Sequence, residues 1–144
     1  MKKIVLLFLF IPFIGFSQEI QMNDINSLYE YSHIRDSTNT TINELEKNIL
    51  ALKYSNIAKS ENTLSGENYF SVMILGTPVQ VHYFISVEFK ENKYKLNISK
   101  FILEDRRWSP VPLENIKSGK SKWIKKINEN LPKIIKSIET ISNW

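Results

Sequence analysis

Cysteine is absent from this chain of 144 residues, and histidine and glycine are scarce, with 2 and 4 residues. The lack of cysteine excludes disulfide bonds, cysteine nucleophiles, thiolate zinc sites and iron–sulfur clusters. The glycines form neither a phosphate-cradling loop nor a Gly-x-Ser-x-Gly nucleophile turn. The residue content therefore predicts a protein that is not an enzyme and that needs no cofactor.

His33 and His82 are the candidates for metal chemistry. They lie on separate expected strands, so a carboxylate such as Glu88 would have to complete a site with them. The alternative is that both histidines are polar strand residues, and we favour it. We therefore expect no metal site.

What the chain does have is an N-terminal export pattern. Lys2 and Lys3 precede an apolar run over Ile4–Phe16, and Gly15 and Ser17 place small residues before a cut at Gln18. A helix over this run reaches about 20 Å, short of the roughly 30 Å of a bilayer core. We expect a cleaved signal peptide at 1–17, a single domain at 18–144, and a periplasmic or secreted protein without a transmembrane anchor.

The net charge of +4 is smaller in the mature chain. Without Lys2 and Lys3, the 19 basic residues become 17 against 15 acidic ones, which leaves +2. This charge is too small to indicate nucleic acid as a partner. Lysines over 117–136 allow an anionic glycan or lipid surface as a partner, or they form the solvated face of a helix.

Local patterns predict the first elements. Leu28–Ile34 alternates like a strand. Thr41 and Glu44 match a capping box, and apolar residues at helical spacing follow up to Leu52, which predicts an amphipathic helix. A strand over 55–59 and a turn at Ser65–Gly66 are expected next.

The middle of the chain predicts antiparallel strands. Tyr69–Leu75 is an apolar run of strand length, and Val79–Phe89 alternates strictly between apolar and polar residues. Tyr94–Ile98 resumes that alternation after a turn, so the two segments form a hairpin. Phe101–Leu103 continues the strand after a change of face, which a bulge would explain.

The last third predicts a long helix. Residues 104–113 read as an irregular connection, because Pro110 and Pro112 disfavour regular structure. From Ser121 an apolar stripe runs at helical spacing through Ile124, Ile127, Leu131, Ile134, Ile138 and Ile141. Pro132 falls within it, with Asn130 placed to cap a second segment, so one kinked helix and two abutting helices both remain open.

These elements predict an α+β fold, a curved antiparallel sheet with two helices on one face. The sequence resembles small exported bacterial domains of unknown function with a TATA-binding-protein-like (TBP-like) fold. The resemblance rests on Phe16-Ser17-Gln18, the helix at Thr41–Tyr54, the hairpin Val87–Ile98, Pro112-Leu113-Glu114 and Lys122-Trp123. It implies the order β-α-β-β-β-β-α, and it implies neither catalytic residues nor DNA binding.

Binding is the function that these patterns favour. Phe84 and His82 lie on the polar side of their strand, so helices on the apolar side leave both on an open sheet face. Trp108 is either an exposed anchor or a plug at the sheet edge. Phe84, His82 and Trp108 are the candidate partner-binding residues of a non-enzymatic module that recognises an envelope protein or ligand. The alternatives are a carrier of a small apolar ligand between sheet and helices and, third, an undetected hydrolase.

Overall fold

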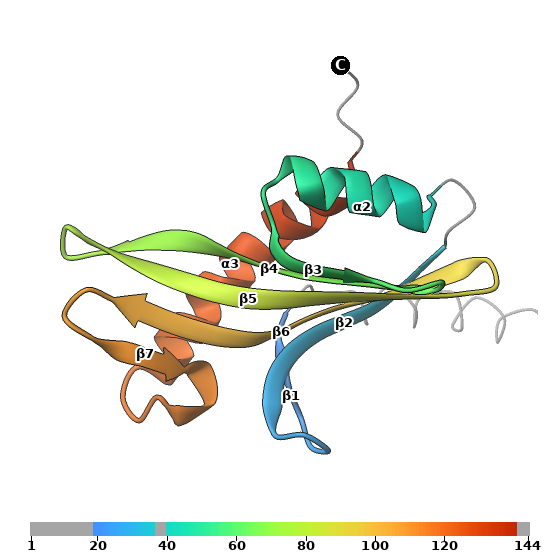
Figure 1. The fold of residues 1–144 in the computed structure, drawn as a ribbon. Helices are drawn as coiled ribbons and strands as arrows, with labels where there is room; N and C mark the ends of the chain where they lie inside the picture. The colour runs from blue at the N-terminus through green and yellow to red at the C-terminus, as the bar shows by residue number, and fades with distance from the viewer. Residues whose placement is uncertain (1–18, 37–39, 141–144) are drawn as a thin grey trace, which may run out of the picture.

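The computed structural model describes residues 19–36 and 40–140. In these ranges the chain forms seven strands, a short 3₁₀ helix η1 and the helices α2 and α3 (Figure 1). Their order is β1 (Gln21–Asn23), β2 (Leu28–Asp36), α2 (Ile42–Ala51), β3 (Ser55–Lys59), β4 (Thr63–Ile74), β5 (Thr77–Lys90), β6 (Lys93–Asp105), β7 (Trp108–Pro112), η1 (Leu113–Asn115) and α3 (Lys120–Glu139). The signal peptide expected at 1–17 and Ile141 lie outside the described residues. Within them, no helix combines the length and the apolar character needed to cross a membrane.

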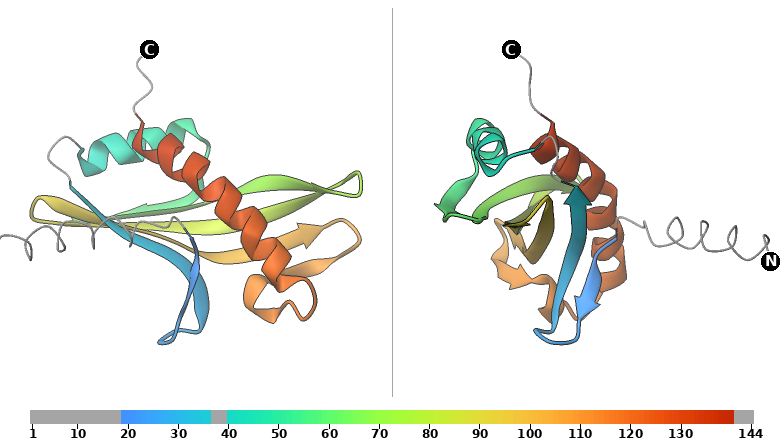
Figure 2. Two further views of the ribbon diagram at one scale, coloured as in Figure 1. Left: turned by 180° about the vertical axis from the view of Figure 1, so that it is seen from behind. Right: turned by 90° about the vertical axis from the view of Figure 1, so that its right-hand side faces the viewer.

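The strands form one antiparallel sheet in the order β1-β2-β6-β5-β4-β3, with β7 also paired to β6. β2 pairs with the first half of β6 and β7 with its last residues, so these two strands share one edge of β6. Seen from behind, α3 crosses the strands diagonally and α2 lies on the same side of the sheet (Figure 2). The expected α+β class, with two helices on one face of an antiparallel sheet, is confirmed.

Helix α2 begins where its sequence predicts. The Thr41 hydroxyl accepts from the Glu44 N–H at 3.2 Å, and the Glu44 carboxylate accepts from the Thr41 N–H at 2.9 Å. Two backbone donors that have no partner in the helix are thus satisfied. Leu45 and Ile49, from the predicted stripe, are buried.

Helix α3 runs unbroken through Pro132, which decides the alternative left open above. Asn130 does not cap a second segment, because its side-chain amide donates to the Lys126 carbonyl at 2.8 Å. Five residues of this helix are buried, namely Ile127, Leu131, Ile134, Ile135 and Ile138. Their packing holds the helix against the sheet despite the hydrogen bond that proline cannot donate.

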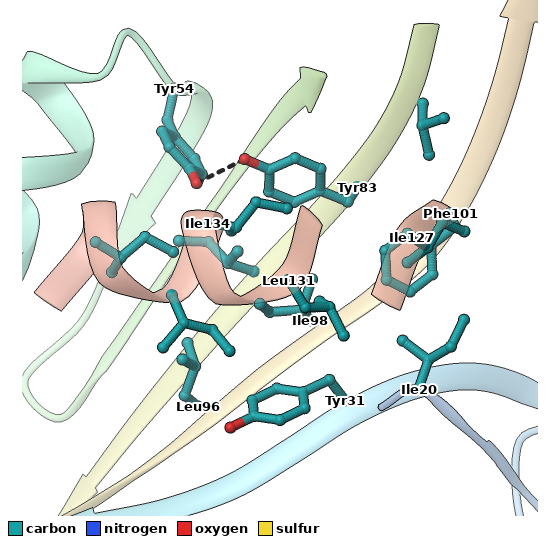
Figure 3. Close-up of a cluster of buried hydrophobic side chains, with 14 of the residues drawn as sticks. Ile20, Tyr31, Tyr54, Tyr83, Leu96, Ile98, Phe101, Ile127, Leu131 and Ile134 are labelled. Atoms are coloured by element: carbon teal, nitrogen blue, oxygen red, sulfur yellow. Dashed lines mark hydrogen bonds between the residues drawn. The ribbon is translucent and has the colours of Figure 1, made fainter. Parts of the chain in front are cut away.

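The core lies between α3 and the inner face of the sheet (Figure 3). Ile98 and Phe101 from β6 and Leu131 from α3 are each 0% exposed. Tyr54 and Tyr83 form a polar pair within it, with their hydroxyl oxygens 2.9 Å apart. Side chains from both layers therefore fill the space beneath α3.

The predicted bulge in β6 is confirmed. The register of β5 and β6 shifts between His82 and Phe84, and Lys100 has a φ of 55°. An extra residue on one strand changes which face the following side chains occupy. Lys100 is therefore exposed while Phe101 is fully buried.

The turn predicted at Ser65–Gly66 is wrong, because both residues lie inside β4. Gly66 is buried against Tyr54, whose side chain would lie 3.4 Å from a Cβ at this position. The glycine is used for close packing under an aromatic ring rather than for a turn.

The irregular connection predicted at 104–113 is also wrong. Arg106 and Arg107 form a tight turn, and β7 and η1 follow it. β7 tolerates Pro110 and Pro112 because it pairs on one side only, so an edge N–H is dispensable. β1 and β7 add two strands to the order β-α-β-β-β-β-α.

Candidate functional site

The sheet face opposite the helices brings together polar and aromatic side chains from β4, β5 and β6. His82 and Phe84 alternate with buried residues of β5 that point toward the helices. The register places Tyr69 of β4 beside His82, and Ile102 of β6 on its other side. Two of the three residues predicted from the sequence, His82 and Phe84, therefore lie on this open face.

A shallow hollow of about 550 Å³ surrounds these side chains. We call it the sheet-face depression. Twelve residues from five strands and the turn before β3 line it, namely Lys53, Ser55, Glu67, Asn68, Tyr69, His82, Tyr83, Phe84, Lys100, Ile102, Glu104 and Pro110. It combines apolar surface with charges of both signs.

His82 connects an aromatic ring and a carboxylate within the depression. Its Nε2 lies 2.8 Å from Oε2 of Glu104, and its ring centroid is 5.3 Å from that of Tyr69. Among the described residues, Nε2 has no further polar partner. His82 and Glu104 thus place an imidazole and a carboxylate side by side in this part of the depression.

Phe84 and Lys100 form the second contact of the depression. The Lys100 Nζ lies 4.6 Å from the centroid of the Phe84 ring, in cation–π geometry. The bulge at Lys100 produces this contact, because it directs the lysine to the open face while Phe101 enters the core. Phe84 is half-buried, so it retains accessible ring surface.

Trp108 lies elsewhere, in the β6–β7 hairpin, and does not line the depression. Its backbone pairs with Asp105, and 39% of its surface is exposed. Asp105 is buried and accepts hydrogen bonds from the Arg107 side chain, the shortest of 2.8 Å, and from the Arg107 backbone N–H. These bonds hold the pKa of the Asp105 carboxyl below its ordinary value of 3.8, and the Trp108 indole adds to the effect.

Tyr69, Lys100 and Glu104 belong to the depression but were not among the residues predicted for the site. Tyr69 lies in an apolar run, and the sequence does not show which strand it pairs with. The change of face near Phe101 was the signal from which the position of Lys100 on the open face could have been predicted. Among the described residues, no three His, Asp or Glu side chains gather as a metal site would require.

Comparison with known proteins identifies the fold. No family model matches the chain, and no curated protein sequence does. Solved structures do match, among them a TBP-like protein from Parabacteroides distasonis, with a TM-score of 0.57 and 12% identity over 84% of this chain and 99% of that one. A DUF4468 family protein from Bacteroides ovatus matches with a TM-score of 0.58 and 12% identity over 85% of this chain and 94% of that one.

The class that these similarities define is a TBP-like α+β protein, and the fold implied by the resemblance in the sequence is confirmed. At 12% identity the similarity concerns the fold alone, and a fold does not determine a function. The function of this chain must therefore be inferred from its own side chains.

Proposed function

We propose that this chain is an exported, non-enzymatic binding module that holds a partner on its open sheet face, at the sheet-face depression. The observation that carries the proposal is the gathering of Tyr69, His82 and Phe84 on the face away from the helices. Tyr69 is 49% exposed, and none of the three belongs to the buried core. Accessible aromatic side chains in a hollow are typical of binding surfaces.

The charges around these rings indicate the chemistry of the partner. Lys100 lies over Phe84, and Glu104 lies beside His82. A partner that presents an apolar group next to a charged group would match this arrangement. A protein loop or a ligand of the cell envelope can offer both groups. The filled space beneath α3 gives less support to the alternative of a carrier for an apolar ligand.

The test is capture of envelope components by the immobilised protein. We expect His82→Ala and Phe84→Asp to lose a partner that the parent chain retains, while both variants keep the parent's circular dichroism spectrum. Ile25→Asp is the matched control, because Ile25 is an apolar residue that is 96% exposed and lies before β2, outside the depression.

Two outcomes would contradict the proposal. If Phe84→Asp fails to fold, Phe84 belongs to the core and not to a binding surface. If both variants fold and capture the same components as the Ile25→Asp control, the depression is not the binding site.

Export is tested separately by N-terminal sequencing of the protein from fractionated cells. A mature N-terminus at Gln18 in the periplasm or medium would support the proposed signal peptide. An intact Met1 in the cytoplasmic fraction would contradict it.

A further inference from the structure

One edge of the sheet is only half covered. β3 pairs with β4 from Ser55 opposite Glu67 to Lys59 opposite Leu64. β4 continues to Ile74, and over 68–74 it pairs with β5 alone. The hairpin of β4 and β5 extends beyond β3 here, at the left of Figure 1. The outer edge of 68–74 therefore has no neighbouring strand among the described residues.

Hydrogen bonds show which backbone groups point outward along this edge. The Tyr69 N–H donates to the Asn68 side-chain oxygen at 2.9 Å, so it does not pair with β5. The Glu67 carbonyl accepts from the Ser55 hydroxyl on the β3 side at 3.5 Å. Since backbone groups alternate between the two edges of a strand, the N–H and C=O groups of Ser71 and Met73 also point outward.

Apart from the Asn68 side chain, which accepts from the Tyr69 N–H, the edge has none of the usual protection against pairing. Strand edges in soluble proteins normally carry charge, proline or a bulge, or they are short. In the described part of the chain, β1 has only three residues and β7 carries Pro110 and Pro112. The segment 68–74 has no charged residue and no proline. Met73 is 62% exposed, and Leu75 at its end is 101% exposed.

We propose that this edge pairs with the same edge of a second copy of the chain, antiparallel and about a two-fold axis at Ser71. Ser71 then lies opposite the partner's Ser71, and Tyr69 lies opposite the partner's Met73. On the other face, Phe70 lies opposite the partner's Val72. The two serines exchange their outward N–H and C=O groups in a hydrogen-bonded pair.

Self-complementarity is the reason to choose a second copy over another protein. Over Tyr69–Met73, an axis at Ser71 pairs apolar side chains with apolar side chains on both faces and brings no like charges together, as an isologous contact requires. Beyond Met73 the same register would reach the partner's Glu67, whose outer edge is already paired with Ser55 of the partner's β3. The new pairing is therefore limited to Tyr69–Met73, between the end of the hairpin and β3 of the other copy.

The test is the oligomeric state of the purified chain by sedimentation equilibrium. We expect a dimer for the parent, and dissociation constants about tenfold higher or more for Ser71→Lys and for Ser71→Glu, since each places like charges across the axis. An equimolar mixture of these two variants should restore dimers. Ser71→Thr, which keeps a small strand-forming side chain, is the matched control and should dimerise like the parent.

A second measurement reports the register directly. The chain contains no cysteine. In Ser71→Cys the single thiol would lie opposite its own copy, and mild oxidation should yield a covalent dimer faster than in Ile25→Cys. A monomeric parent at about 100 µM would overturn the proposal, and so would a dimer that Ser71→Lys leaves intact or equal oxidation rates for the two cysteine variants.

Discussion

The hydroxyl pair of Tyr54 and Tyr83 gives a sharp test of the core. Tyr54 is 7% and Tyr83 5% exposed, and their oxygens lie 2.9 Å apart. Burial raises the pKa of both hydroxyls above their ordinary value, so both stay protonated at neutral pH. Replacing either tyrosine by phenylalanine removes one hydroxyl and leaves the other without this partner. An unsatisfied buried hydroxyl costs about 1–3 kcal/mol.

The two replacements should differ in size. The Asn68 side chain acts to lower the pKa of the Tyr54 hydroxyl, so Tyr83→Phe leaves this hydroxyl with a polar neighbour. We expect a loss of about 1 kcal/mol in the free energy of unfolding for Tyr83→Phe and about 2 kcal/mol for Tyr54→Phe. The double variant removes both polar groups and should lose less than the sum of the two single losses, with a coupling of about 1 kcal/mol.

Urea unfolding of the parent, the two single variants and the double variant measures the four free energies of this cycle. In thermal unfolding, each kcal/mol lost should lower Tm by about 3–5 °C for a domain of this size. Tyr69→Phe is the matched control, because Tyr69 is 49% exposed and its hydroxyl can reach water. Its effect should stay within about 0.5 kcal/mol. Additive single losses, or no loss in either, would refute the inferred hydrogen bond.

Three further substitutions test other features of the fold by the same unfolding assay. Gly66→Val should destabilise by about 1–3 kcal/mol because the larger side chain meets Tyr54, whereas a loss no greater than that of Gly66→Ala would contradict the close packing. Phe101→Ala should cost about 3–5 kcal/mol, since Phe101 is 0% exposed, and a cost under 1 kcal/mol would show that the bulge does not place it in the core. Asp105→Asn should lower stability at pH 7. Because the pKa of Asp105 is depressed in the folded state, this difference should persist above pH 3.8 and fade as the pH falls below it, and a pH-independent difference would contradict the role of the carboxylate.

The features that depend on local sequence patterns were predicted correctly. The start of α2 depends on Thr41 and Glu44, three residues apart, and it lies where expected. The alternation over Val79–Phe89 likewise predicted β5 and the two faces of the sheet. The wrong predictions lie where packing between distant segments determines the local structure. Gly66 lies in a strand because Tyr54 packs against it, and Pro110 is accepted because β7 is an edge strand.

In the candidate site, too, the positions set within one strand were predicted, and the contacts between strands were not. The positions of His82 and Phe84 on the open face follow from alternation within one strand. The contacts with Tyr69 and Glu104 depend on strand register, and the contact between Lys100 and Phe84 depends on a bulge. Register and bulges are set by pairing between segments, which no local pattern in one strand contains.

The pairing of β2 with β6 also bears on the order in which the chain can fold. β4, β5 and β6 are neighbours in both sequence and sheet, joined by two hairpins, so they can pair soon after they are synthesised. Tyr31 of β2 can pair with Ile98 only after β6 has been synthesised. The Ile20 N–H donates to the Asn128 side chain, which is 108 residues later in the sequence. Until β6 has been synthesised, β1 and β2 can therefore pair only with each other. A molecule built in this way completes its sheet only after most of its length has been synthesised, so its N-terminal strands are the last to join the sheet.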